Sequence, residues 1–162
     1  LYHPQLDEVA TLADAHPNLT IILNHVGSPI LGGPYRGKSD EVFADWRTRI
    51  KSVGERPNVF VKLGAMPIRM PGFDGDRSLP PRSEEVAAAW RPWIETCIEA
   101  FGPSRSMFES NFPVQKRWCS YQVCWNAFKR LAAGASDTEK QDLFAGAAAR
   151  AYRMDERANS LG

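Results

Sequence analysis

The chain has 162 residues, of which 43% are hydrophobic and 24% are charged, and its formal net charge is +1. This is the composition of a globular protein with enough residues for a real core. Because Lys and Arg are spread along the chain and the net charge is close to zero, neither nucleic acid nor an anionic membrane is expected as a partner. The expectation of a small-molecule substrate comes from the strand-end residues described below, and a homo-oligomer is left open.

Cysteine usage and hydropathy point to the compartment. The three cysteines include no C-x-x-C pair, so we expect reduced thiols in a cytoplasmic protein. No apolar run approaches the roughly 20 residues of a membrane helix, and no signal peptide is expected. The chain opens with Leu1-Tyr2-His3-Pro4, without an initiator Met, as if in the tail of a strand. We therefore expect one domain over residues 1–162 that lacks its N-terminal part.

Helical and strand-like patterns alternate along the chain. Helical spacing of apolar residues predicts helices over 4–15, from Ser39, from Ser83 to Phe101, from about 121 to Gly134, and after a capping box at Ser136–Glu139. Pro92 is expected to start a second helical segment. Continuous apolar runs predict buried strands at 20–25, 59–64 and 106–114, and the Pro- and Gly-rich residues 65–82 are expected to form a long loop.

Buried strands that alternate with helices indicate a parallel sheet with helices packed outside it. Two architectures fit: a doubly wound sheet, or part of a (β/α)8 barrel of the TIM type. There is no G-x-G-x-x-G after the first strand, as a dinucleotide-binding fold would require. A whole barrel takes about 250 residues, so four βα units would make about half of one.

Polar residues collect where the strands should end, which is where both architectures place their ligand sites. His25 follows the apolar run Ile21–Asn24 and is the strongest candidate, as a metal ligand, a general acid or base, or a donor to a substrate oxygen. His3 and Tyr2 are weaker candidates for the same rim. Asn111 stands at the end of the last strand, and two-residue spacing would place it on the same face as Glu109.

Two further interpretations concern charged residues. Lys62 and Glu109 lie on consecutive strands about two residues from the exit, and a buried ion pair is expected because either charge alone would be costly to bury. Arg36, in a loop rich in Gly and Pro, could hold a substrate carboxylate or hydroxyl over the mouth of the site. Trp118 and the loop 115–120 could line the same opening.

Several of these stretches resemble one known family. They are Ile22–Gly27, Gly33–Tyr35, Val61–Gly64, Met107–Val114 and Gly146–Tyr152, and they are similar in sequence and order to the amidohydrolase-related (amidohydrolase 2) family, nearest to its sugar-lactone and pyrone-dicarboxylate lactonase branch. The resemblance implies a (β/α)8 barrel of which this chain is the second half, strands five to eight. It also implies that His25 contacts a substrate carbonyl or a metal, and that Asn111 occupies the place of the acid that activates water.

The chain departs from the family pattern in two respects. The family usually has Asp where this chain has Asn111, and an amide can orient water but cannot act as a general base. The paired histidines of the first barrel strand are absent, and the three histidines present have no metal-ligand spacing, so the sequence itself predicts no metal residue. The resemblance leaves open one zinc-type divalent metal in the complete protein.

The main hypothesis is therefore a lactonase-like hydrolase of a sugar-acid or dicarboxylate lactone or ester, in which His25 polarises the carbonyl and Asn111 and Arg36 position the reactants. A decarboxylase or hydratase of the same family is an alternative. The rival from another class is a non-catalytic half-barrel fragment or degenerate homologue. An isolated half-barrel would expose two strand edges and a hydrophobic interior face, and it is expected to associate.

Overall fold

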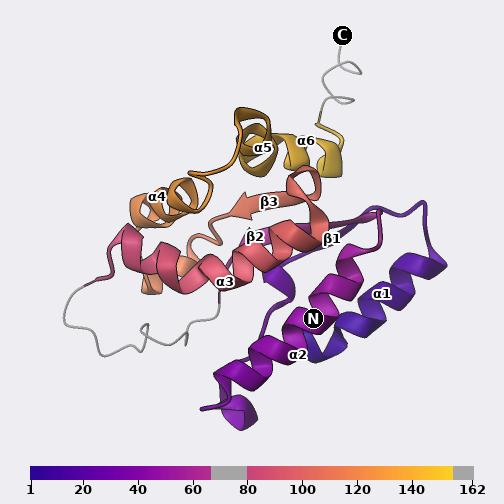
Figure 1. The fold of residues 1–162 in the computed structure, drawn as a ribbon, viewed down its shortest axis with the longest axis horizontal. Coiled ribbons are helices and arrows are strands. Elements are labelled where there is room, and N and C mark those ends of the chain that lie inside the picture. Colours follow the sequence, from indigo (N-terminus) through magenta and orange to yellow (C-terminus); the bar gives the residue numbers. More distant parts are fainter. Residues whose placement is uncertain (67–79, 155–162) are drawn as a thin grey trace.

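The computed structural model describes residues 1–66 and 80–154, which form a parallel sheet with helices packed against it (Figure 1). The sheet runs in sequence order through β1 (Ile21–Leu23), β2 (Val59–Gly64) and β3 (Ser106–Glu109). The helices are α1 (Leu6–Ala15), α2 (Ser39–Gly54), α3 (Ser83–Phe101), α4 (Tyr121–Leu131), α5 (Asp137–Gln141), a π-helical turn (Asp142–Gly146) and α6 (Ala147–Tyr152). The alternation of strand and helix that the sequence predicts is therefore present.

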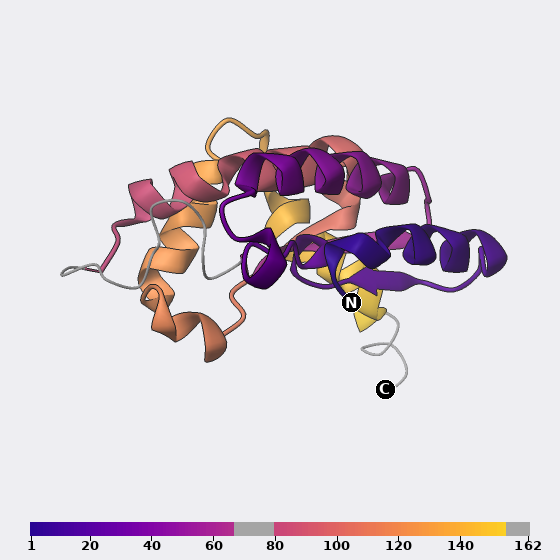
Figure 2. The ribbon, with the colours of Figure 1, turned by 90° about the horizontal axis from the view of Figure 1, so that it is seen from below.

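The two faces of the sheet are covered differently. Val59, Val61 and Leu63 of β2 point into the main core, which also contains buried residues of α1, α2, α3 and α4. The other face carries Met107, which packs against Ala147 and Ala151 of α6. Figure 1 shows α5 and α6 beside β3, and α1 near the opposite edge of the sheet, at β1. In the view of Figure 2, α2 and α3 form one continuous layer over the sheet. Helix α6 thus covers part of the face that an open half-barrel was expected to expose.

The main core is unusually aromatic. Trp46 of α2 and Trp93 of α3 lie with ring centroids 4.6 Å apart, and Phe108 of β3 stacks on Phe128 of α4 at 4.6 Å. Such contacts add to the burial of large apolar surfaces, and truncating one of these rings to Ala costs about 3–5 kcal/mol. These ring contacts therefore tie β3 to the helices on one face of the sheet.

Several predicted boundaries are wrong. The segment expected as a strand tail, Leu1–His3, runs into a 3-10 turn at His3–Gln5, so the sheet has three strands in the described residues. Helix α3 continues through Pro92, because burial of the helix face on both sides of it, at Trp90 and Ile94, offsets the hydrogen bond that proline cannot donate. The predicted loop 65–82 lies mostly outside the described residues, at 67–79.

Two predicted strands are also too long. Strand β1 stops at Leu23 and β3 at Glu109, and each is followed two residues later by a residue with positive φ: 58° at His25 and 52° at Asn111. A left-handed residue ends the regular alternation of side chains. Asn111 therefore does not continue the strand face of Glu109, as the two-residue spacing had predicted.

The helix caps and the cysteines are as the sequence predicts or allows. The capping box at Ser136 and Glu139 is present, and Ser120 caps α4 through a hydrogen bond from the Val123 N–H. Cys97, Cys119 and Cys124 are free and buried. Within the described part of the chain, none of the helices combines the length and the hydropathy needed to cross a membrane.

Candidate active site

The candidate site lies where the three parallel strands end at one edge of the sheet. Parallel pairing aligns Gly64 with Glu109 and Lys62 with Met107, so the carboxyl ends of β2 and β3 are level. His25 follows the end of β1, which pairs with β2 on its other side. The structure brings together His25, Glu109 and Lys62, from three different strands.

A left-handed turn aims His25. The φ angles of His25, Val26, Gly27 and Ser28 are 58°, 46°, 75° and 48°. Non-glycine residues rarely adopt this conformation, least of all a β-branched one, and each instance costs on the order of 1–3 kcal/mol. Strain of this size persists only where the surrounding structure holds it, and it is concentrated at functional sites.

Contacts from three elements hold the turn. The indole of Trp46 in α2 donates a hydrogen bond to the carbonyl oxygen of Val26 at 2.7 Å. The backbone N–H of His3 bonds the Ser28 carbonyl at 3.3 Å. Gly27 packs so closely on α1 that a Cβ there would lie 2.8 Å from a methyl carbon of Leu6. The turn is therefore fixed before any ligand binds.

Glu109 binds His25 through both the ring and the backbone. The ring nitrogen Nδ1 of His25 hydrogen-bonds Oε1 of Glu109, and the backbone N–H of His25 donates to the same oxygen at 3.2 Å. An ionised carboxylate only accepts hydrogen bonds, so the Nδ1 that faces it carries a proton, and in the neutral form of the ring this is the only ring proton. Nε2 is then left with a free lone pair, which makes it a proton acceptor. The exposed fractions of the two side chains are 35% for His25 and 16% for Glu109.

Gly64 makes this contact possible. Glu109 leaves β3, the third strand, and must pass β2 to reach the end of β1. At Gly64, a Cβ would lie 2.9 Å from Cγ of Glu109 and 2.0 Å from its carbonyl oxygen. The missing side chain at Gly64 thus provides the space through which the carboxylate crosses the middle strand.

Lys62 faces the second oxygen of the same carboxylate. Its Nζ lies 3.8 Å from Oε2 of Glu109, within ion-pair distance, and 23% of the Lys62 side chain is exposed. The ammonium also lies 5.7 Å from the centroid of the Tyr152 ring in α6. The expected pair of Lys62 and Glu109 is therefore present, but the carboxylate is shared with His25, which the sequence did not indicate.

His3 is held inside the protein and not at this site. It is 1% exposed, its Nδ1 accepts a hydrogen bond from the Ile30 N–H at 3.1 Å, and its ring meets that of Tyr35 edge-on at 5.2 Å. Burial lowers the pKa of His3, against a smaller raising effect of Asp45. The neutral ring therefore fits a structural contact with the 30–35 loop.

The other predicted residues are not brought onto Glu109. Arg36 is exposed at the end of the turn Gly33–Tyr35, and its side chain makes no hydrogen bond to any described residue. Asn111 is half-buried near the exit of β3, and its backbone carbonyl accepts a hydrogen bond from Gln115 N–H at 3.0 Å. The indole N–H of Trp118 is buried with no hydrogen-bond partner in the described residues.

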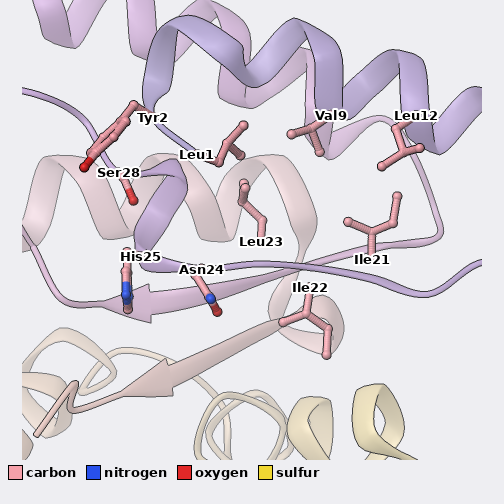
Figure 3. Close-up of a pocket in the computed structure, with 10 residues that line it drawn as sticks. All are labelled: Leu1, Tyr2, Val9, Leu12, Ile21, Ile22, Leu23, Asn24, His25 and Ser28. Carbon is pink, nitrogen blue, oxygen red and sulfur yellow. The ribbon is translucent and has the colours of Figure 1, made fainter.

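A groove of about 450 Å³ runs beside the free edge of β1, between that strand and α1 (Figure 3). In Figure 3, Leu1, Val9 and Leu12 face β1 from the side of α1, while His25 and Asn24 point away from that helix. The lining is mostly apolar, with polar groups at one end: Leu1, Tyr2, Val9, Leu12, Ile21, Ile22, Leu23, Asn24, His25 and Ser28. Tyr2 is 57% exposed there. The groove meets the candidate site at His25.

A metal centre would need more ligands than these residues supply. A catalytic zinc site takes three protein ligands. Residues 1–66 and 80–154 contain no group of three His, Cys, Asp or Glu side chains placed to hold a metal ion. His25 and Glu109 are the two such groups in contact here, so no catalytic step is assigned to a metal.

Comparison with known proteins identifies the family to which this fold belongs. The amidohydrolase family model matches residues 1–154, and the chain belongs to that family. It is 37% identical to the uncharacterized protein y4mH of Sinorhizobium fredii over 154 residues. That match covers 95% of this chain and 46% of y4mH. It is 29% identical over 161 residues to the L-fucono-1,5-lactonase of Burkholderia multivorans, covering 99% of this chain and 52% of the lactonase.

A solved structure has a similar fold over about half of its length. An amidohydrolase from Burkholderia multivorans, crystallised with bound zinc, superposes with a TM-score of 0.76 at 27% identity, covering 94% of this chain and 50% of that one. The chain thus spans about half the length of the curated relatives it matches. The resemblance to a family with lactonase members, expected from the sequence, is confirmed.

Proposed function

We propose that the protein hydrolyses a lactone or ester of a sugar acid or dicarboxylate, with His25 and Glu109 as its acid–base pair. The observation that carries this proposal is the contact of Glu109 with Nδ1 of His25, which leaves Nε2 as a proton acceptor at the strand-end rim. The substrate class is supported by relatives that include an L-fucono-1,5-lactonase. Because the chain spans about half of those relatives, the activity is proposed for the complete protein.

The pair supplies a base that Asn111 cannot. Nε2 of His25 takes a proton from water while the water oxygen bonds the carbonyl carbon. The imidazolium that forms is stabilised by the Glu109 carboxylate on its other nitrogen. When the ring C–O bond breaks, Nε2 returns the proton to the leaving alkoxide and a hydroxy acid is released. Asn111 and Arg36 remain proposed as groups that position the substrate.

This role differs from the one expected from sequence, where His25 polarises the carbonyl as a donor. A neutral ring whose Nδ1–H is bound to Glu109 has no second N–H to donate. The donor role is open to it only after it has taken up a proton, in the second half of the reaction. For the neutral ring, this contact therefore supports the role of base.

The test uses the complete protein and L-fucono-1,5-lactone among a panel of sugar-acid lactones, with acid release followed by a pH indicator. His25→Ala and Glu109→Gln are each expected to lower kcat by roughly 10²- to 10⁴-fold. His16→Ala is the matched control, because His16 is an exposed histidine at the end of α1. Full activity of His25→Ala would overturn the proposal.

We also propose that the sheet is the second half of a (β/α)8 barrel, strands five to eight being represented by the segment before His3 and by β1, β2 and β3. The order β1-β2-β3 and the packing of α1 to α4 in one core on one face support this. The groove beside β1 then takes an extended strand that runs parallel to β1. Tyr2 is extended and its neighbour His3 bonds Ser28 beyond the carboxyl end of β1, which gives the direction in which such a strand would arrive.

A further inference from the structure

Lys62 lies next to the His25–Glu109 pair. Of the two carboxylate oxygens, it faces Oε2, the one that His25 does not bind. We propose that Lys62 is a positioning residue: it holds Oε2 of Glu109 so that Oε1 stays on the ring and backbone of His25. The effect of Lys62 on catalysis rests on the proposed function, whereas its contact with Glu109 is present in the structure. The contact with Lys62 would thus fix the orientation of the carboxylate, in addition to compensating its charge.

The carboxylate needs a second anchor. The terminal torsion of a Glu side chain is broad and nearly two-fold, so a contact through one oxygen does not fix the plane of the group. Both bonds from His25 go to Oε1, and Lys62 Nζ lies 3.8 Å from Oε2. With the Glu109 side chain only 16% exposed, this attraction is screened less than that of a surface pair. The two oxygens are therefore held by two different residues, His25 and Lys62.

Lys62 is itself restrained, by the C-terminal helix. Its Nζ makes no hydrogen bond to any residue in 1–66 or 80–154, so its charge is directed at two groups: Glu109 and the Tyr152 ring, 5.7 Å away. An ammonium over an aromatic face is attracted by the ring quadrupole. Tyr152 of α6 thus limits how far the flexible Lys62 side chain can swing from the carboxylate. Helix α6 is connected to His25 through this chain of contacts.

The backbone supports the same arrangement. Lys62 pairs in register with Met107, two residues before Glu109, and it shares the strand face of that carboxylate. Gly64 follows Lys62 by two residues on β2, pairs in register with Glu109 and leaves the space above β2 open. A lysine on this face of β2 can therefore reach Oε2 without displacing the side chain that crosses toward His25.

The decisive measurement is the tautomer of His25 in this chain, read from two-bond ¹H–¹⁵N correlations of its imidazole. The chain has three histidines, so each can be assigned with a single variant. The wild-type ring is expected as one Nδ1–H tautomer. Lys62→Met is expected to give a mixture of tautomers with a faster-exchanging Nδ1 proton, and Lys62→Arg to restore the single tautomer, because Arg keeps the charge beside Oε2.

Two further variants make the test specific. Lys51→Met is the matched control, because it breaks an ion pair of similar length, 3.7 Å to Glu99, on the exposed surface. Tyr152→Leu changes an exposed residue, so it leaves the core intact, and it is expected to shift His25 in the direction of Lys62→Met by a smaller amount. A His25 signal unchanged in both Lys62→Met and Tyr152→Leu would overturn the proposal.

Kinetics of the complete protein separate this inference from the proposed function. Lys62→Met is expected to lower kcat and kcat/KM together by roughly tenfold, with KM unchanged, as for an interaction that matters in the transition state. If the tautomer of His25 responds to Lys62 while no lactone is hydrolysed, the positioning role stands and the proposed function fails. If lactone hydrolysis requires His25 but Lys62→Met leaves tautomer and kcat unchanged, the positioning role fails alone.

Discussion

Trp46 and Val26, twenty residues apart in the chain, are joined by a buried hydrogen bond of 2.7 Å from the indole N–H to the carbonyl oxygen. Val26 has φ of 46°, so this bond holds a strained residue next to His25. Helix α2, which contributes no catalytic group, thus fixes the conformation of the turn that does. Because Trp46 is part of the main core, the strained turn at His25 and Val26 is stabilised by packing of that core.

Trp46→Phe removes this bond and leaves the Val26 carbonyl without its donor. We expect the free energy of unfolding to fall by about 1–3 kcal/mol more than ring truncation alone would cause. Urea titration measures it, with Trp93→Phe as the control, because Trp93 is a buried neighbour whose indole bonds no described residue. Equal losses in the two variants would show that the bond is not what holds the turn.

Gly64→Ala tests the passage of Glu109 across β2. A methyl group 2.0 Å from the Glu109 carbonyl oxygen and 2.9 Å from its Cγ forces the strands or the side chain to move. We expect destabilisation of about 1–3 kcal/mol, together with loss of the single His25 tautomer. Gly134→Ala is the control, because nothing lies within 4 Å of a Cβ there, and it is expected to be neutral or slightly stabilising. A Gly64→Ala protein with native stability would contradict the crossing.

Acid is expected to destabilise the fold through His3. Its pKa in the folded protein is lowered from 6.5, mainly by burial, so the unfolded chain binds the proton more readily. Stability is therefore complete above the unfolded pKa and declines as the pH falls below about 6.5 toward the lower folded pKa. His3→Asn keeps an acceptor for the Ile30 N–H and does not titrate. Unfolding free energies measured between pH 8 and pH 5 should slope less in this variant than in the wild type, and equal slopes would rule His3 out as the cause.

The groove beside β1 predicts association of the isolated chain. Leu1, Leu12 and Leu19 are 53%, 46% and 51% exposed, and β1 is an edge strand of the described sheet. Exposed apolar side chains along an unpaired edge favour pairing with another chain. Sedimentation velocity should therefore detect oligomers that Leu12→Lys diminishes. Val114→Lys, at an equally exposed apolar residue far from β1 in the sequence, is the control. A chain that stays monomeric at all concentrations would argue against the idea that the groove beside β1 takes up another strand.

Much of the framework could be predicted from local sequence. The apolar runs and helical stripes gave the order of β1, α2, β2, α3 and β3, and short motifs identified the family. Each of those signals depends on residues that are close together in the chain, within a single helix, strand or turn. The strand ends were placed less well, because a left-handed residue such as His25 or Val26 leaves no mark in the hydrophobic pattern that distinguishes it from a strand.

The sequence by itself therefore indicated where a site should form, since a buried parallel strand delivers polar groups at its exit, and it pointed to His25, Lys62 and Glu109. It also pointed to His3, which the structure instead buries against the 30–35 loop. It did not determine which of them meet. His25 and Glu109 are 84 residues apart, and their contact depends on strand register, on the open space at Gly64 and on a turn held by Trp46. Only the tertiary structure decided that Glu109 serves His25 as well as Lys62, because register and side-chain reach are set by long-range packing and not by the residues next to them in the chain.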